Sequence, residues 1–393
     1  DEAVYSPNLP DRGLHSGYWS AGRAQSVGME GVFVRAVASA YDLTRDAIQA
    51  DGQPVYSLKE RLQIEKDLLL ESTKLLVADS AINNKSVENR SAAGIVGMVV
   101  GEPDLVRFGM EGFQRTVTDW FLPDGGTPES PAYADMALSG IVDFSQALRG
   151  YSDPPGYTDD QGKRYDNFDP YQQDAFQKVW RGMFNSLQGD LKYPPVGDSY
   201  EESKMTASYA ELMADNYPDR PEYLALLKAV LGGDWNKPYT PYAIYYAQPG
   251  RENTPIPPLD FPSYCFPDLR VGFMRTGTHG RESLLLLSAS HWGMHHHLDS
   301  LNLYYWNQGN ELLSDLGYLW DHPDMHKTVR TLAHNTVLID EEDQIGDGRG
   351  GTVEYFVDGP RVKAMRASSQ AYAEASRYER AVTLIDHGAS RSY

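Results

Sequence analysis

The feature that most constrains this chain is a concentration of histidine in one short stretch. Seven of its ten histidines lie between His291 and Asp340, among segments with the composition of β-strands. They are His291, His295, His296, His297, His322, His326 and His334. Imidazole binds metal ions and carries protons near neutral pH, so the pattern predicts a β-rich region with a metal site, a general base or both.

The spacing of these residues predicts which of them hold the metal. In a strand, His295 and His297 would share one face, because side chains alternate. A predicted hairpin returns Asp315 towards His297, and His334 directly precedes an expected strand at 335–340. Two imidazoles and a carboxylate suit Zn²⁺, so His297, Asp315 and His334 are the candidate ligands. This choice leaves His295 for catalysis.

Three ordered motifs in this stretch resemble the central β-domain of the heparinase II/III-like polysaccharide lyases, a group that includes alginate and oligoalginate lyases. They are His-x-His-x-Asp from His295, Gly-x-x-x-x-Ser-Asp-x-Gly from Gly309, and Ala-His-Asn-Thr-Val around His334. The resemblance implies an incomplete α/α toroid followed by an antiparallel β-sandwich. We expect the zinc ion to be structural, because it would pin the loop that presents His295.

Periodicity along the chain independently favours an α+β protein with sequential domains, because helical patterns give way to short strand patterns. We expect an arm at 1–25, the toroid at 26–237, an aromatic and proline-rich linker at 238–262, and the β-domain at 263–393. Strands are expected at 270–275, 283–290, 300–306, 311–315, 335–340, 351–356, 360–366 and 379–386. We expect the β-domain to be incomplete at Tyr393, since similar proteins continue with more strands.

Two motifs in the helical half are similar to motifs of the same family. The segment DGGTPESPAY at 124–133 resembles a loop that ends in a functional tyrosine, here Tyr133. The segment ENRS at 88–91 resembles one with a functional asparagine, here Asn89. Many relatives carry histidine after this asparagine, whereas this chain has Arg90. A weaker similarity is the loop PVGDS at 195–199.

The resemblance implies β-elimination on a uronic acid, and the chemistry explains the residue types. Asn89, with Arg90, would neutralise the sugar carboxylate while the C5 proton is removed. Tyr133 would be the acid, and also the base in a syn elimination, whereas His295 would be the base in an anti elimination. Positive charge near Tyr133 would have to lower its pKa, and Arg90, Arg330 or the metal could supply that charge.

The remaining candidate residues would contact the substrate. They are Arg90, Glu129, Arg330 and Trp320. The 26 tyrosines and 7 tryptophans suit sugar stacking, although most of these rings are expected in the core. Taken singly, Asn89 could be an ordinary helix residue or part of a glycosylation sequon, and Tyr133 could be a core aromatic.

The composition of the chain limits which classes of molecule it can bind. The formal net charge of −20 argues against nucleic acid and requires any acidic polysaccharide to bind at a locally basic cleft. No apolar run is long enough to cross a membrane. The single Cys265 excludes an internal disulfide framework. The chain starts at Asp1 without a signal sequence, so we expect a removed leader and a secreted or periplasmic protein. The oligomeric state is left open.

Three other functions stay open at this point. A uronate C5-epimerase would use the same proton abstraction and leave chain length unchanged. An α/α-toroid glycoside hydrolase would need two carboxylates, for which Glu129 and Asp198 are available, but it gives no reason for the histidines. A non-catalytic glycan-binding or zinc-storing protein would not depend on Tyr133. Which uronate glycan a lyase would cleave is beyond the sequence.

Overall fold

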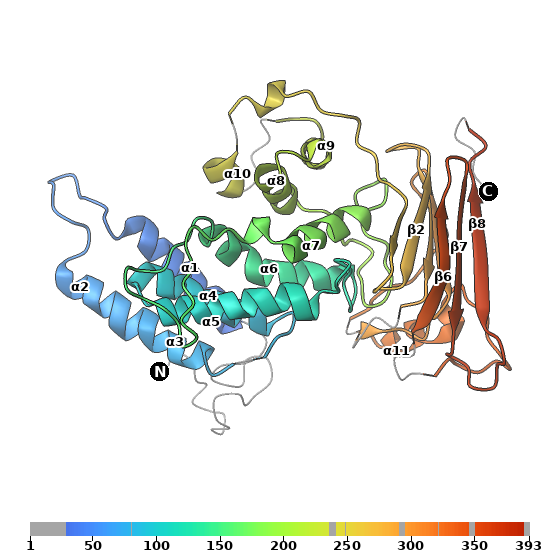
Figure 1. The fold of residues 1–393 in the computed structure, drawn as a ribbon, viewed down its shortest axis with the longest axis horizontal. Coiled ribbons are helices and arrows are strands. Elements are labelled where there is room, and N and C mark those ends of the chain that lie inside the picture. The colour runs from blue at the N-terminus through green and yellow to red at the C-terminus, as the bar shows by residue number, and fades with distance from the viewer. Residues whose placement is uncertain are drawn as a thin grey trace. The chain divides into compact units, whose positions relative to one another are not determined.

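The structure is a computed structural model that describes residues 29–79, 81–235, 241–247, 249–290, 295–320, 322–345 and 350–388. The chain divides into two compact units, whose elements are labelled in Figure 1. The first comprises Asp1–Phe121 and Ala134–Phe176, and the second comprises Leu122–Tyr133 and Gln177–Tyr393. The arm predicted at 1–25 lies outside the described residues, and the domain boundaries stay predictions.

The first unit is helical where it is described. Its elements are α1 (Met29–Thr44), α2 (Leu58–Leu62), η2 (Gln63–Leu70), α3 (Glu71–Leu76), α4 (Ser86–Val100), α5 (Pro103–Arg115), η3 (Thr116–Trp120), η4 (Pro170–Gln172), most of α6 (Pro131–Ala147) and the start of α7 (Asp174–Asn185). A capping box of Ser57 and Glu60 begins α2.

Glycine allows α4 and α5 to pack closely side by side (Figure 1). A Cβ atom on Gly94 of α4 would lie 2.5 Å from the ring of Phe144 and 3.2 Å from the Cα atom of Gly109 on α5. Without side chains at these two positions, the helices approach and the phenylalanine ring fills the remaining space. Most of α4 is therefore buried, including the segment that carries Asn89.

The second unit adds helices α8 (Ala207–Asn216), α9 (Pro221–Val230), α10 (Pro241–Tyr246) and α11 (Met325–Thr328), the short η5 (Arg251–Asn253) and η7 (Thr331–Ala333), and two antiparallel sheets. One sheet has the order β1 (Tyr264–Phe266), β2 (Val271–Thr276), β3 (Ser283–Ser288), β4 (Asn302–Asn307) and β5 (Asn310–Leu313). The other has the order β6 (Gly351–Asp358), β7 (Val362–Ser369) and β8 (Glu379–Ile385). Helices followed by antiparallel sheets confirm the predicted α+β class.

One expected strand and the strand conformation assumed for the spacing of His295 and His297 are wrong, and both lie beside the histidines. Residues 335–340 form no strand: Ile339 makes a single isolated bridge to Glu342, and at Asn335 the side chain donates to the carbonyls of Leu303 and Ser314. The stretch from His295 to Asp299 is an irregular connection, not a strand. Strand β1 was not expected, and α10 lies within the predicted linker.

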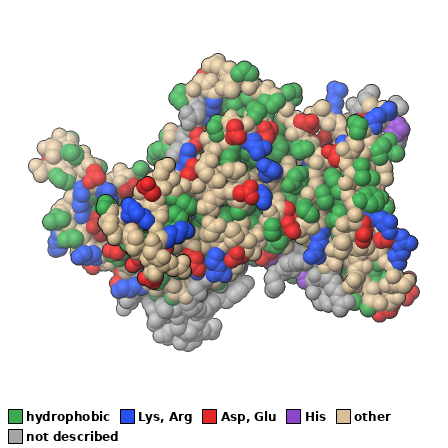
Figure 2. Space-filling view, viewed as in Figure 1, with side chains coloured by type: hydrophobic (Ala, Val, Ile, Leu, Met, Phe, Trp, Pro, Cys, Tyr) green, Lys and Arg blue, Asp and Glu red, His purple; other side chains and the backbone are tan. Residues whose placement is uncertain are grey.

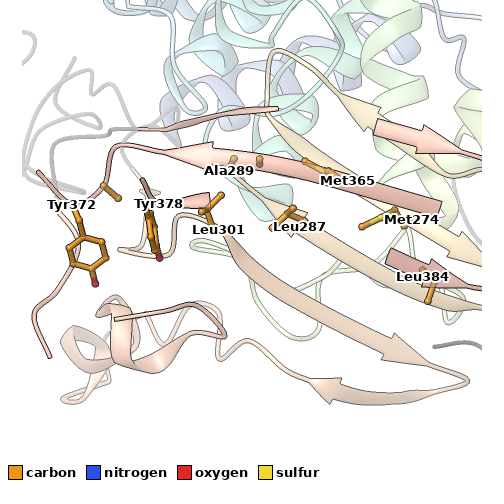
Figure 3. Packing of buried hydrophobic residues seen from close by; sticks show 10 residues of the cluster. Met274, Leu287, Ala289, Leu301, Met365, Tyr372, Tyr378 and Leu384 are labelled. Carbon is orange, nitrogen blue, oxygen red and sulfur yellow. The ribbon is translucent and has the colours of Figure 1, made fainter. Parts of the chain in front are cut away.

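The two sheets pack face to face around an apolar core (Figure 3). Met274 on β2 and Leu287 on β3 belong to the same buried cluster as Met365 on β7 and Leu384 on β8. A Cβ atom on Gly272 would lie 2.2 Å from the Met365 sulfur, so the glycine lets the sheets approach at this point. The second unit therefore contains a β-sandwich.

The opposite face of the five-stranded sheet is also covered, which explains why every residue of β2 is buried. Val196, from the segment after α7, joins the apolar cluster on this face. The buried guanidinium of Arg275 donates to the carbonyls of Asn185 and Pro262 at 2.7 and 2.6 Å. These contacts fix the end of α7 and the segment before β1 against the sheet.

The surface drawn in Figure 2 carries acidic and basic side chains interspersed with apolar ones. This mixture is ordinary for a protein surface. In the part of the chain that the structure describes, no helix is both long and apolar enough to cross a membrane.

The carboxyl group of Glu282 makes stability depend on pH. Burial raises the pKa of Glu282 to about 7, although Arg275 opposes the shift. Folding therefore favours the protonated form, and the free energy of unfolding should fall by about 3 kcal/mol as pH rises from about 4.5 to about 7. Urea denaturation at several pH values measures this dependence, and the free energy of unfolding of Glu282→Gln should lack the fall between pH values of about 4.5 and about 7. The exposed Glu374→Gln should follow wild type, and a Glu282→Gln profile parallel to wild type would contradict the prediction.

Candidate active site

The centre of the candidate site is a stack of two rings from distant parts of the sequence. Tyr133 lies in the first turn of α6, and its ring centroid is 3.6 Å from that of His295, with 18° between the planes. Only 6% of Tyr133 is exposed. Both residues belong to the second unit. The structure therefore brings together two of the three predicted catalytic residues.

A carboxylate that the sequence analysis did not assign to the site bridges two of the histidines. Asp198 Oδ2 lies 2.8 Å from His295 Nδ1, and Asp198 Oδ1 lies 3.1 Å from His297 Nε2. Burial alone would raise the pKa of Asp198, but the hydrogen bonds to both imidazoles outweigh it and lower that pKa. An ionised Asp198 accepts a hydrogen bond from each ring. The sequence pointed to this residue only through the PVGDS similarity and as a carboxylate that a glycoside hydrolase could use.

A second carboxylate lies on the other side of the His295 ring. Glu129 Oε2 is 3.3 Å from His295 Nε2. Glu129 lies in the loop directly before α6, so this loop and the first turn of α6 contribute an anionic neighbour and the stacked phenol. The predicted substrate-binding role of Glu129 stays a prediction, and its position makes it a direct contact of the candidate base.

The environment of Tyr133 does not match the expectation of a lowered pKa. Burial raises the pKa of Tyr133, and a hydrogen bond with Tyr318 and the negative charge of Asp198 raise it further. The phenol therefore keeps its proton throughout the neutral range. This state suits a proton donor and does not suit a base.

The three predicted metal ligands come together in the second unit. His297, Asp315 and His334 are buried, and one potential ligand atom from each lies within 4.8 Å of the others. Asp315 is held by the amide of Asn302, at 2.8 Å, and by the backbone N–H of Gly317, at 3.0 Å. The hairpin of β4 and β5 therefore returns Asp315 to the histidines as predicted.

Buried polar atoms beside these ligands support a metal ion. His297 Nδ1 and both carboxylate oxygens of Asp299 are buried, and none has a hydrogen-bond partner among the described residues. Burial raises the pKa of Asp299 to about 6, whereas the nearby His334 and His297 lower it. Unsatisfied buried donors and acceptors are costly, and a divalent cation would compensate them. The residues therefore fit a metal, and Asp299 is a neighbour that the predicted ligand set omitted.

Exposed aromatic rings lie beside the stacked pair. Trp320, the predicted sugar contact, is 44% exposed and adopts a left-handed backbone conformation, with φ of 46°. Its ring centroid is 5.7 Å from that of Tyr318, which is 5.4 Å from that of Tyr200. Strained backbone at an exposed ring is a feature of functional surfaces. Tyr200 and Tyr318 were not predicted, because isolated tyrosines carry no distinctive spacing.

Arg330 and the first-unit candidates have partners of their own. Arg330 is exposed and pairs with Asp343 at 2.8 Å. Asn89 is buried, accepts a hydrogen bond from the backbone of Gly31 at 3.1 Å and donates one to Asp79 at 3.0 Å.

Arg90 is also buried within the first unit. Its guanidinium lies 4.3 Å from the centre of the Phe108 ring, and burial lowers its pKa. The roles of Asn89, Arg90 and Arg330 towards a substrate stay predictions.

Comparison with known proteins agrees with the resemblance. Residues 267–387 match the family model "Heparinase II/III-like, C-terminal". An alginate lyase of Stenotrophomonas maltophilia is 23% identical over 354 residues, which cover 80% of this chain and 44% of that protein. An exo-oligoalginate lyase of Saccharophagus degradans is 22% identical over 346 residues, which cover 77% of this chain and 42% of that protein. The chain thus spans less than half the length of these relatives.

Solved structures of low sequence identity share the fold. The heparan sulfate lyase HepC of Pedobacter heparinus superposes with a TM-score of 0.64 at 14% identity, covering 91% of this chain and 51% of that one. A structure of heparinase III gives 0.61 at 14% identity, covering 96% and 55%. Together with the family model and the alginate lyases, these likenesses confirm the predicted fold class and support the heparinase II/III-like lyase superfamily.

Zinc binding directly tests the assignment of His297, Asp315 and His334 as metal ligands. The protein should bind a single zinc ion, and free zinc at about 100 times its dissociation constant should stabilise the fold by about 2.7 kcal/mol. Asp315→Asn should abolish both effects, because it removes an anionic ligand from a buried site. Metal analysis after dialysis and thermal melting with added zinc would measure them.

The exposed His326→Ala is the matched control for this experiment and should bind zinc like wild type. Equal zinc binding by Asp315→Asn and wild type would contradict the assignment.

Proposed function

From its likeness to the heparinase II/III-like lyases, we propose that this protein is a polysaccharide lyase acting on a uronic-acid-containing glycan by β-elimination. The observation that supports this proposal most is the stacked pair of Tyr133 and His295, with Asp198 hydrogen-bonded to His295 Nδ1 at 2.8 Å. The pair combines a protonated phenol and an imidazole, the acid and the base that an elimination needs.

The proposed reaction begins with loss of the C5 proton. With Nδ1–H of His295 donated to Asp198, Nε2 carries the lone pair and accepts the C5 proton. The electron pair of the C5–H bond forms the C4–C5 double bond, and the C4–O bond to the next sugar breaks. Tyr133 donates its proton to the leaving oxygen. The elevated pKa of Tyr133 fits this role, since the phenol is protonated before the reaction.

Negative charge on the uronate has to be neutralised while the proton leaves. Asn89 and Arg90 stay our proposed groups for this step, on the resemblance alone. When bound, the metal would place positive charge beside the loop of His295 and His297. We propose a structural role for it, because its candidate ligands are buried and one of them, His297, is two residues from the base.

The substrate is proposed at the level of its chemical class. Two relatives are named for alginate or oligoalginate, and structural neighbours are named for heparan sulfate or heparin. The shared feature is a 4-linked uronate, and the sequence, with a formal net charge of −20 and without an obvious cluster of many basic residues, favours a carboxylated over a heavily sulfated chain. Action outside the cytoplasm, secreted or periplasmic, is part of the same proposal.

The same geometry gives less support to a glycoside hydrolase or a C5-epimerase. A hydrolase would need two carboxylates free to face the glycosidic bond. Asp198 is bonded to two imidazoles, and Glu129 lies 3.3 Å from one of them. A C5-epimerase would use the same pair of residues, and its product would keep the length of the polymer.

An absorbance screen against acidic polysaccharides tests this proposal. Cleavage should generate unsaturated, ultraviolet-absorbing ends together with shorter chains. Tyr133→Phe and His295→Ala should each lower kcat by about 100-fold or more, the usual contribution of a positioned acid or base. The exposed Tyr355→Phe on β6 should retain activity.

Two results would reject the proposed role. Full activity in Tyr133→Phe would remove the phenol from the mechanism. Altered polymer composition without shortening would replace the lyase with an epimerase.

A further inference from the structure

We propose that Asp198 is a positioning residue that couples the metal site to the catalytic base. The proposal rests on the lyase function above for its catalytic part, whereas its metal part is independent of any substrate. Its basis is that one carboxylate accepts hydrogen bonds from His295 and from His297, through a different oxygen in each case.

The position of Asp198 is fixed by its own loop. The backbone N–H of Asp198 donates to the carbonyl of His295 at 3.3 Å, and its carbonyl accepts from Ser130 Oγ at 3.2 Å. The next residue, Ser199, accepts from the backbone N–H of Ala132 at 3.0 Å through its hydroxyl. The loop therefore holds the segment before Tyr133 and the segment of His295 together.

The metal-binding hairpin contacts the same loop. Gly317 has a φ of 57°, and a Cβ atom there would lie 2.3 Å from the carbonyl oxygen of Ser199. Only glycine allows this approach without strain. Gly317 also donates its N–H to Asp315 at 3.0 Å, so the loop of Asp198 and the hairpin with a metal ligand form one packed structure.

The two hydrogen bonds determine which nitrogen of each ring is free. A carboxylate only accepts, so His295 carries its proton on Nδ1 and His297 carries its proton on Nε2. His295 Nε2, which lies 3.3 Å from Glu129 Oε2, is then the nitrogen left to act as a base. His297 Nδ1 is then available to a metal, and it is buried without a hydrogen-bond partner among the described residues. A single group thus selects the tautomer of the base and that of a metal ligand.

A metal bound to His297 would strengthen this arrangement. Carboxylates that accept from a metal-bound imidazole fix its orientation and raise its affinity for the ion, and losing such a partner costs about 10- to 100-fold in affinity. Because Asp198 also holds His295, the metal would order the base without touching the sugar. Coupling of this kind is reciprocal for binding equilibria.

Asp198→Asn is the decisive variant, because it keeps the shape and removes the second acceptor oxygen. Zinc affinity, measured by competition with a chromogenic chelator, should fall by about 10- to 100-fold. The ¹⁵N signals of the His295 ring should show loss of the Nδ1–H tautomer. Where lyase activity is measurable, kcat should fall by about 100-fold or more while KM changes little, as for a group that orients a base.

The exposed Asp190→Asn is the control and should leave all three readouts unchanged. Unaltered zinc affinity and an unaltered His295 tautomer in Asp198→Asn would overturn the coupling, whatever the activity. Failure of the lyase proposal would appear differently, as the expected zinc and tautomer changes without any elimination product from wild type.

Should Asp198→Asn fail to fold, the wild-type protein still decides the matter. The ring signals of His295 can be assigned by their loss in His295→Gln. They should shift when a chelator removes zinc and return when zinc is restored. Ring signals of His295 that do not respond to zinc would overturn the proposal.

Discussion

The hydrogen bonds from two imidazoles to the Asp198 carboxylate are the constraint on which the candidate site depends. They determine the orientation of His295, which lies against the Tyr133 ring. They also leave Nδ1 of His297 as the nitrogen that can bind a metal ion. Without an ionised acceptor at this point, neither tautomer would be selected. A proton acceptor and a metal ligand only two residues apart can therefore keep distinct roles.

The surrounding sandwich supplies the rigidity that this arrangement needs. The five-stranded sheet is covered on both faces, and the buried Arg275 ties the end of α7 to it through a backbone carbonyl. The site itself is rich in carboxylates, with Asp198, Glu129 and Asp299 close to the histidines. An anionic sugar approaching such a site needs compensating positive charge, which a divalent metal would provide.

The sequence predicted the α+β class, most strands and the meeting of His297, Asp315 and His334, because these follow from periodicity and from motifs close together in the chain. The prediction of a strand at 335–340 was wrong because side-chain hydrogen bonds of Asn335 are made there in place of backbone pairing with a neighbouring strand. Strand-like composition does not reveal such side-chain hydrogen bonds. Asp198 was also missed as a site residue. That carboxylate reaches His295 from 97 positions away, a distance in sequence that only the folded chain closes.

The most direct test of the account is a crystal structure of Tyr133→Phe protein with a bound oligouronide. The account predicts a uronate ring whose C5 atom lies within about 3.5 Å of His295 Nε2 and whose leaving oxygen faces position 133. Asp198 should still bridge His295 and His297 in that complex. A sugar bound elsewhere, with His295 Nε2 still facing Glu129 and no uronate near it, would contradict the account.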